Sequence, residues 1–470
     1  MPDTELNYLS ACEALERFRR RELSPVELLD AVILRAEAIA DSVNPLADRY
    51  FDEARDRARQ SERRYARGSA RRLDGLPLLV KDDTPIRGKR ATVGSQLYAD
   101  HVDTVSHPSA QRLLRAGANL FARSTCPEFC WLFTCHSRLW GVTRNPWRLD
   151  ITPGGSSGGS AAALAAGATT LATGSDSAGS IRQPAAQCGV VGYKPPYGRN
   201  PQAAPASFDP YIHVGPMARS VGDAALMQNV MSGPHALDHN SLRNRVTLRA
   251  EPEDVRGLKI ACSMDLGHYE IDDDVRRETS ALLEALRAAG AEVDEIEVDW
   301  ASEAIRLAHL NQEFMFASLL EDAVANHADE ISDYVPQLLQ TAAAVSAEDY
   351  RRSQAVAGTV WQDHFGPLLR RYDAFVTPAV SCPEVPAQNW QKDLVRVNGR
   401  ELTDTDAAMT ALFNMFSRCP VLSVPAGMTD RGLPVGVQVV GRPYDDAMPF
   451  RIGMAVERLR PWAQRRPPCR

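Results

Sequence analysis

Two glycine- and serine-rich turns carry hydroxyl groups at a spacing that suggests catalysis. The first is GGSSGG at 154–159, and the second is SDSAGS at 175–180. The residues between them predict a helix from Ser160 that stops at Gly167, followed by a strand through about Thr173. A serine hydroxyl is a weak nucleophile that needs an adjacent base, and neither turn contains histidine. We therefore consider a site of paired serines with a lysine base.

Lys81 is the candidate base, because it closes the apolar run LPLLV, which predicts a short buried strand. A partly desolvated lysine has its neutral form populated near neutral pH, as a general base requires. A lysine at a strand end is more often a solvated surface residue, so Lys81 is a candidate only in combination with the two turns.

Other interpretations of GGSSGG fit less well. A phosphate-binding P-loop needs Lys and then Ser or Thr after the last glycine, but Ser160 and Ala161 follow Gly159. No G-x-G-x-x-G pattern predicts a dinucleotide site. The G-x-S-x-G pattern of a nucleophile elbow matches around Ser156, but the preceding TRNPWRLDITP is polar and broken by proline, whereas an elbow follows a buried strand.

A cluster of thiols raises the question of a metal. Cys126, Cys130, Cys135 and His136 lie close together in the sequence. Structural zinc usually needs closely spaced cysteine pairs and a second pair elsewhere, which the chain lacks. We expect packing or pocket lining for these residues, no bound metal and no cofactor.

Composition limits the function classes. The 470 residues are 44% hydrophobic and 24% charged, with a net charge of −7, which argues against a polybasic surface for nucleic acid or membranes. No run of about 18 apolar residues predicts a membrane span. Nine scattered cysteines fit reduced thiols in a cytoplasmic protein better than a disulfide framework.

Strand and helix patterns interleave along nearly the whole chain, which predicts one large α/β domain over 1–470 with a mixed, twisted sheet covered by helices. Residues 1–70 are predicted to be helical, with Ser24 as a helix N-cap and Pro25 after it. Residues 300–370 are predicted to form a helical cap. VLSVPAG and LPVGVQVVG predict two strands of a hairpin around 429–432.

Longer segments carry a specific resemblance. GGSSGGSAAALAAG followed by GSDSAGSIRQPAAQCGVVGYKP closely resembles the signature of the amidase signature family, and VKDD is similar to its lysine motif. STCPEFCWLF, WGVTRNPW, HVGPMARSVGDAA and LPVGVQVVG also resemble blocks of that family. The resemblance covers about 8–460 and is strongest over 76–220, the expected catalytic core.

The resemblance implies a role for each matching residue. Ser180 matches the nucleophile that becomes acylated, Ser156 the bridging serine that the family holds with a cis peptide bond, and Lys81 the base. The proton would pass from Ser180 to Ser156 to Lys81, with the two hydroxyl groups within hydrogen-bond reach. Asp176 and Arg182 match a pair that supports the nucleophile loop.

Backbone amides of the same loop match the family's oxyanion hole. A glycine-rich turn can aim several N–H groups at the point where negative charge develops. The chain departs from the family pattern twice, with Ala178 where many members have glycine and Asp83 where asparagine is common. The amides implied are those of Ser177, Ala178, Gly179 and Ser180.

The implied function is an amide hydrolase that acts through an acyl-enzyme on small apolar or aryl amides, with esters and carbamates as further candidates. FCWLF (129–133) is placed along the pocket, with Cys130, Trp131 and Phe133 as substrate-binding residues. The alternative within the family is the A subunit of a glutamyl-tRNA amidotransferase. A pseudo-enzyme that keeps only the fold is disfavoured, because all three catalytic positions are filled. The expected partner is a small-molecule substrate, and the family resemblance implies a homodimer.

Overall fold

A computed structural model describes residues 6–249, 253–327, 329–388 and 395–469. The helices are α1 (Ala11–Arg20), α2 (Pro25–Ala38), α3 (Phe51–Ala66), α4 (Pro108–Arg115), α5 (Gly158–Ala165), α6 (Arg182–Cys188), α7 (Val221–Met231), α8 (Asp273–Ala288), α9 (Ala301–His327), α10 (Tyr334–Ala343), α11 (Ala347–Val360), α12 (Gly366–Arg371), α13 (Asp404–Ala407), α14 (Leu412–Met415) and α15 (Ala447–Leu459).

The strands are β1 (Leu46–Arg49), β2 (Pro77–Lys81), β3 (Asn119–Ser124), β4 (His136–Ser137), β5 (Gly141–Val142), β6 (Leu171–Asp176), β7 (Val191–Lys194), β8 (His213–Ala218), β9 (Lys259–Cys262), β10 (Glu292–Glu295), β11 (Ala374–Pro378), β12 (Val395–Val397), β13 (Arg400–Leu402), β14 (Val421–Met428) and β15 (Pro434–Gly441).

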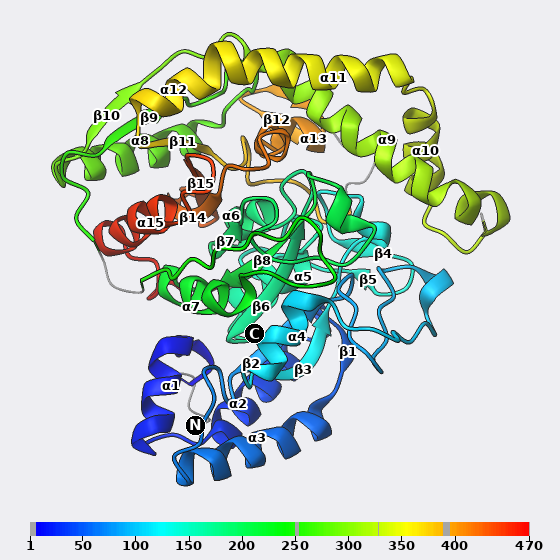
Figure 1. The fold of residues 1–470 in the computed structure, drawn as a ribbon, viewed down its shortest axis with the longest axis vertical. Helices are drawn as coiled ribbons and strands as arrows, with labels where there is room; N and C mark the ends of the chain where they lie inside the picture. The colour runs from blue at the N-terminus through cyan, green and yellow to red at the C-terminus, as the bar shows by residue number, and fades with distance from the viewer. Residues whose placement is uncertain (1–5, 250–252, 328, 389–394, 470) are drawn as a thin grey trace.

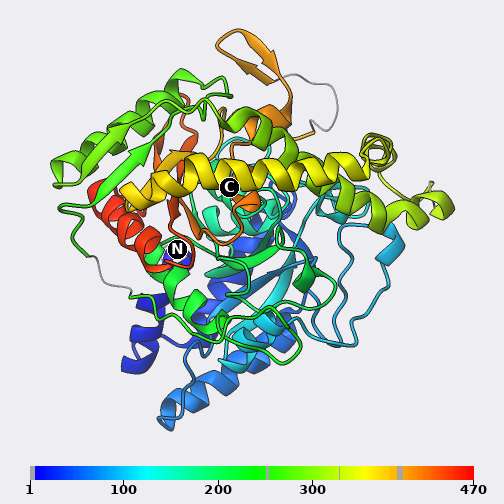
Figure 2. The same ribbon diagram turned by 45° about the horizontal axis from the view of Figure 1, so that its top comes forward.

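Eleven of these strands form one sheet in the order β1-β3-β2-β6-β8-β7-β14-β15-β11-β9-β10. Strand β2 runs parallel to β3 and β6, and β9 runs parallel to β10 and β11, whereas the remaining neighbours are antiparallel. Helices lie around this sheet in both views (Figures 1 and 2). The predicted single α/β domain with a mixed sheet is therefore confirmed.

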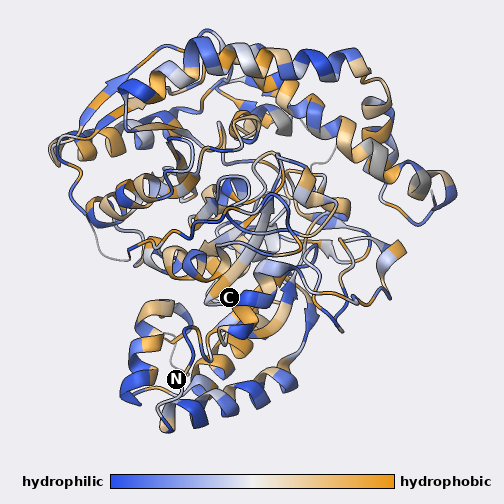
Figure 3. Cartoon of the chain, in the orientation of Figure 1, coloured by the Kyte–Doolittle hydropathy of each residue, from blue (hydrophilic) through white to orange (hydrophobic). Residues whose placement is uncertain are grey.

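The first seventy residues contain α1, α2 and α3, which lie at the bottom of Figure 1. Ser24 caps α2 as predicted, since its hydroxyl accepts from the Val26 N–H and its own N–H donates to Glu27. Helix α3 is mostly hydrophilic (Figure 3) and buries only its Ala54, Ala58 and Ser61 side. The segment also contains β1, an edge strand that pairs with β3 and was not predicted.

Helices α9, α10 and α11 form a layer at the top of Figure 1, away from the N-terminal helices. Helix α9 packs against the segment after β3, where Trp131 stacks on Phe316 with ring centroids 5.1 Å apart. This layer therefore brings residues from the second half of the chain next to the 129–133 stretch. None of the helices among the described residues is both long enough and apolar enough to cross a membrane.

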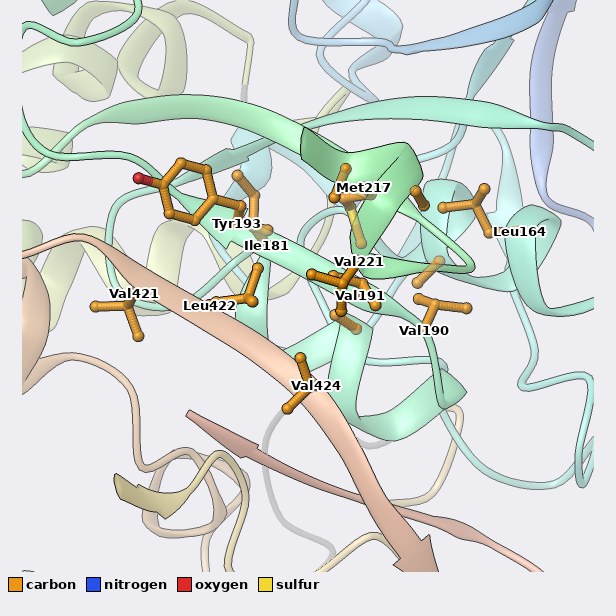
Figure 4. Close-up of a cluster of buried hydrophobic side chains, with 14 of the residues drawn as sticks. Leu164, Ile181, Val190, Val191, Tyr193, Met217, Val221, Val421, Leu422 and Val424 are labelled. Carbon is orange, nitrogen blue, oxygen red and sulfur yellow. The ribbon is translucent and has the colours of Figure 1, made fainter. Parts of the chain in front are cut away.

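The core beside the two serine-rich turns is tightly packed (Figure 4). Ile181, directly after Ser180, is fully buried among Tyr193 of β7, Met217 of β8 and Leu422 of β14. Burial of such a side chain contributes about 1.5–3 kcal/mol. This packing anchors the end of the second turn to the centre of the sheet.

Candidate active site

The site is built at one edge of the sheet, where two neighbouring parallel strands end. Strand β2 ends at Lys81 and β6 at Asp176, and the two strands pair through Leu78 and Leu171. The Lys81 N–H donates to the Thr173 hydroxyl over 3.1 Å. Because the carboxyl ends of parallel strands meet at one edge, Lys81 and the second serine-rich turn lie side by side.

Strand β6 continues three residues beyond its predicted end at Thr173. Residues Gly174, Ser175 and Asp176 pair with β8, which runs antiparallel beside β6. The pattern of the β6 residues alone does not reveal this partner. Part of the second serine-rich turn is therefore strand, and this pairing fixes the position of Ser175.

The Lys81 ammonium group lies between two serine hydroxyls. Its Nζ is 2.7 Å from Ser156 Oγ and 2.7 Å from Ser175 Oγ, and the side chain is fully buried. The Gly155–Ser156 peptide bond is cis, as the resemblance implied. Ser156 therefore lies where the sequence predicted, but Ser175 was given no role. Its position at the end of a strand, within a turn of several serines, was the available signal.

Asp83 changes the expected state of Lys81. One carboxylate oxygen of Asp83 lies 3.1 Å from Lys81 Nζ and also accepts from Ser175. Burial is the largest single contribution and lowers the pKa of the Lys81 amine, but the Asp83 carboxylate together with the Cys130 and Cys126 side chains raises this pKa above its ordinary value. The Asp83 carboxylate therefore opposes the neutral form of Lys81 that the sequence-based interpretation requires. The aspartate in place of asparagine has a larger effect than the sequence indicated.

The two serine-rich turns are joined through the backbone. The Ser157 N–H donates to the Ser180 carbonyl oxygen over 3.2 Å, and the Ser157 hydroxyl donates to the Ser175 carbonyl over 3.3 Å. Ser180 is 4% exposed. Within the described structure, no hydrogen bond joins the Ser156 hydroxyl to the Ser180 hydroxyl. The predicted approach of the turns is present, whereas the predicted hydrogen bond between these two hydroxyls is not.

A buried ion pair supports the loop that carries Ser180. Arg182 Nη2 and Nε donate to the two oxygens of Asp176, each over 2.9 Å, and both side chains are inaccessible to solvent. Burial opposes ionisation of Asp176, but the Arg182 guanidinium and the Asn414 amide lower the pKa of the carboxyl well below its usual range. The pair predicted from sequence is therefore present and fully desolvated.

Residues far along the chain complete this support. Arg182 also donates to the Thr410 carbonyl, to Gln438 Oε1 and to Asn414 Oδ1, over 2.9, 2.6 and 2.5 Å. The Thr410 hydroxyl donates in turn to the Ala178 carbonyl. No motif in the sequence pointed to these three anchors, because they lie more than 220 residues from the loop.

The loop amides divide into two groups. The Gly179 and Ile181 N–H groups donate to Asp176, over 2.9 and 3.2 Å. Gly179 is therefore committed to the loop and not aimed at a substrate, which corrects its expected place among the oxyanion donors. Over the described ranges, the N–H groups of Ala178 and Ser180 have no protein acceptor. The assignment of the Ala178 and Ser180 amides, and of the Ser177 amide, to an oxyanion hole stays a prediction.

Apolar side chains surround the other side of the loop. Ala178 belongs to a small buried cluster with Tyr211, Ala308 and Ala411, against which Phe133 packs. A cavity of about 280 Å³ opens next to Lys81 and is lined in part by Asp83, Cys130, Ser156, Ser175, Ser177 and Phe316. Of the three predicted substrate-binding residues, Cys130 lines this cavity. Trp131 and Phe133 do not: Trp131 stacks on Phe316, which lines the cavity, and Phe133 packs against the cluster that contains Ala178.

The thiol cluster shows no metal geometry. No three His, Cys, Asp or Glu side chains within the described part of the chain gather as ligands would. Cys130 Sγ lies 3.5 Å from Asp83 Oδ2, and Cys135 Sγ lies 3.9 Å from the Thr125 hydroxyl. These contacts agree with the expected roles of pocket lining and packing.

Comparisons with known proteins agree with this geometry. The family model described as Amidase matches residues 27–449. An acylamidase of Rhodococcus erythropolis is 33% identical over 99% of this chain and 98% of its own length. The A subunit of the glutamyl-tRNA(Gln) amidotransferase of Geobacter metallireducens is 31% identical over 97% of this chain and 98% of its own. The crystal structure of a bacterial aryl acylamidase of the amidase signature enzymes superimposes with a TM-score of 0.89 at 28% identity, covering 97% of each chain. The chain therefore belongs to the amidase signature family and is an amidase.

Proposed function

We propose that this protein hydrolyses small amides with an apolar or aryl group through an acyl-enzyme on Ser180, with Ser156 and Lys81 as the proton relay. One observation carries the proposal. The buried Lys81 amine lies 2.7 Å from Ser156 Oγ, on the turn whose next residue, Ser157, is bonded to the Ser180 backbone. A lysine and two serine turns are thus held together without histidine, as a Ser–Lys mechanism needs.

The reaction follows from this arrangement. Ser180 Oγ attacks the amide carbon while its proton moves to Ser156 Oγ, and the proton of Ser156 moves to a neutral Lys81 amine. The negative charge on the former carbonyl oxygen is stabilised by the Ala178 and Ser180 amides. When the carbon–nitrogen bond breaks, the relay returns the proton to the leaving amine. Water then attacks the ester on Ser180 by the same relay and releases the acid.

Apolar surroundings support the substrate class. Phe133 and the Ala178 cluster flank the nucleophile loop on one side, and Phe129 and Phe316 line the neighbouring cavity. Burial of a substrate ring against two such side chains contributes about 1.5–3 kcal/mol. Arg182 is fully engaged by Asp176 and the three downstream anchors, so it is not available to bind a substrate carboxylate.

Labelling of the nucleophile tests the mechanism. A fluorophosphonate should label the wild type at Ser180, and mass spectrometry of the digested protein locates the adduct. Ser180→Ala should abolish labelling. Ser157→Ala is the matched control, because it removes a neighbouring hydroxyl whose hydrogen bond within the described structure is to the Ser175 backbone carbonyl. An adduct on Ser156 or Ser157 in the Ser180→Ala variant would contradict the assignment.

Substrate preference tests the pocket. We expect kcat/KM for an aryl acylamide to exceed that for glutamine, and Phe316→Ala to reduce the aryl preference about tenfold or more, since a ring that lines the cavity is lost. Trp131→Ala tests the support of Phe316 separately. A preference for glutamine, or an aryl preference that neither variant changes, would sink this substrate class.

A second candidate is the A subunit of a glutamyl-tRNA amidotransferase. It is favoured by the relatives of that name, which are 31% identical over nearly the full length of both chains. Here the amide would be glutamine, and tRNA and a second protein chain would be required. Purification from the native host separates the two candidates, because a free-standing hydrolase is active without a co-purifying chain. The same sample, sized by light scattering, tests the predicted homodimer.

A further inference from the structure

The relay contains a carboxylate for which the proposed mechanism has no use. Asp83 follows β2 by two residues, and its side chain lies 3.1 Å from Lys81 Nζ. Ser175 and Thr84 donate to its two oxygens, and Cys130 Sγ lies 3.5 Å from one of them. The carboxylate is thus held in place on several sides and lines the cavity beside Ser156.

The relay of the proposed function works only if Lys81 begins each cycle neutral. The proton that leaves Ser180 displaces the proton of Ser156, and that second proton can be accepted only by an unprotonated Nζ with a free electron pair. An ammonium group at Lys81 must therefore first release a proton to solvent. A carboxylate 3.1 Å away stabilises the ammonium form and opposes this release.

We propose that Asp83 is a positioning residue that keeps Lys81 protonated in the resting enzyme and so confines turnover to alkaline solution. This inference rests on the proposed role of Lys81 as the base. Asp83 also orients the amine, because it accepts from Ser175, the second hydroxyl bonded to Nζ.

Other groups around Lys81 do not supply an equivalent charge. Cys126 and Cys130 approach from the segment after β3. The hydrogen bond with Cys130, and then burial, raise the pKa of Cys126, so the Cys126 thiol stays neutral. The loop before α5 and strand β6 contribute only hydroxyls, those of Ser156 and Ser175. Arg123 of β3 donates to the Lys81 backbone carbonyl, not to its side chain.

Two further titratable groups lie near the pair. Burial lowers the pKa of His107, before α4, to about 4, so this imidazole is neutral at pH 7 and above. The Asp82 carboxylate accepts from Thr92 and Trp140. Asp83 is consequently the anion in direct contact with Lys81 among the described residues.

The direction of the effect follows from the sign of each contribution. Burial disfavours the ammonium form, whereas the Asp83 carboxylate, 3.1 Å from Nζ, is the largest of the contributions that favour it, and the pKa of Lys81 lies above its ordinary value. If Asp83 becomes neutral, the main opposition to burial is lost and the pKa of Lys81 falls. The acidic limb of the pH–rate profile then moves to lower pH, and activity at neutral pH rises.

The test is the pH dependence of Ser180 labelling by a fluorophosphonate, together with kcat/KM for an aryl ester, in the wild type and in Asp83→Asn. We expect the midpoint of the acidic limb to fall by one pH unit or more in Asp83→Asn, with a rate at pH 7 about tenfold higher. Asp83→Ser is a second neutral variant in case the first does not fold. Asp82→Asn, at the adjacent carboxylate, should leave the midpoint unchanged, and Asp83→Glu should restore part of the alkaline shift.

Each outcome decides between the two claims. Variants of Asp83 that label at Ser180 with the wild-type midpoint overturn this inference and leave the proposed function intact. Variants that fold but label at no pH also overturn it, because Asp83 would then be needed for reaction itself. A wild type that is never labelled at Ser180 removes the proposed function and, with it, this inference.

Discussion

Arg182→Met should destabilise the protein by leaving a buried carboxylate without its counter-charge. Arg182 is inaccessible to solvent and donates twice to Asp176 and once to each of Thr410, Asn414 and Gln438. Methionine has a similar length but no donor. Asp176 keeps the Gly179 and Ile181 amides, which cannot replace a full positive charge.

The size of the loss can be estimated. Removal of one partner from a buried ion pair costs about 3–5 kcal/mol. An unfolding entropy of roughly 2.1 cal/mol/K per residue amounts to about 1 kcal/mol/K for the 470 residues, so the melting temperature should fall by about 3–5 °C. The loss should shrink in acid, because the uncompensated Asp176 can then be protonated, whereas the wild type needs that carboxylate ionised.

Differential scanning calorimetry of a double-mutant cycle measures this effect. Asp176→Asn with Arg182→Met should cost less than the sum of the single variants, since no charge is then stranded. Arg199→Met is the matched control, because Arg199 pairs with Asp446 in a similarly buried site away from the loop. It should lower the melting temperature comparably but leave Ser180 labelling unchanged. Additive losses, or equal labelling defects in Arg182→Met and Arg199→Met, would refute the reasoning.

Three further predictions concern single side chains. In Gly179→Ala, an added Cβ would lie 1.8 Å from the Thr410 hydroxyl, at a φ of +127°, so the loop must shift. We expect kcat to fall about 100-fold or more, and a near-normal kcat would show that the loop tolerates the methyl group. Lys81→Ala should lose at least about a thousandfold in kcat/KM at the optimal pH of the wild type, measured with an aryl ester; an ordinary rate would make Lys81 a structural residue only. Burial and repulsion by Arg182 lower the pKa of Lys194 to about 7 from 10.5 in the unfolded chain. The unfolded state therefore binds more protons between these values, and denaturant titrations should show wild-type stability rising from pH 7 to 10 relative to Lys194→Met; parallel curves would contradict this.

Local patterns predicted much of the fold. The N-cap at Ser24, the buried strand ending at Lys81 and the C-terminal hairpin all follow from residues within a few positions of each other. The sequence did not predict β1 or the last three residues of β6, because both are strands only through partners elsewhere in the sheet. Pairing across the sheet, not propensity, decides those segments.

The site divides in the same way. Lys81, Ser156 and the Asp176–Arg182 pair were predicted and lie where expected. The effect of Asp83 on the charge state of Lys81 was not predicted, because it depends on the distance between the two side chains in the folded protein. The Gly179 amide was likewise assigned from its place in a glycine-rich turn, whereas its direction is set by the Asp176 carboxylate.

The anchors of the Ser180 loop also have a consequence for synthesis. Thr410, Asn414 and Gln438 lie 228, 232 and 256 positions beyond Arg182. At about 5–20 residues per second, a ribosome makes Gln438 roughly 13–50 s after Arg182. During this interval the nascent chain already contains Lys81 and both serine-rich turns, but Arg182 can pair only with Asp176. Reactivity toward acylating agents should therefore appear late on the ribosome, which spares an exposed, half-built chain from modification at its nucleophile.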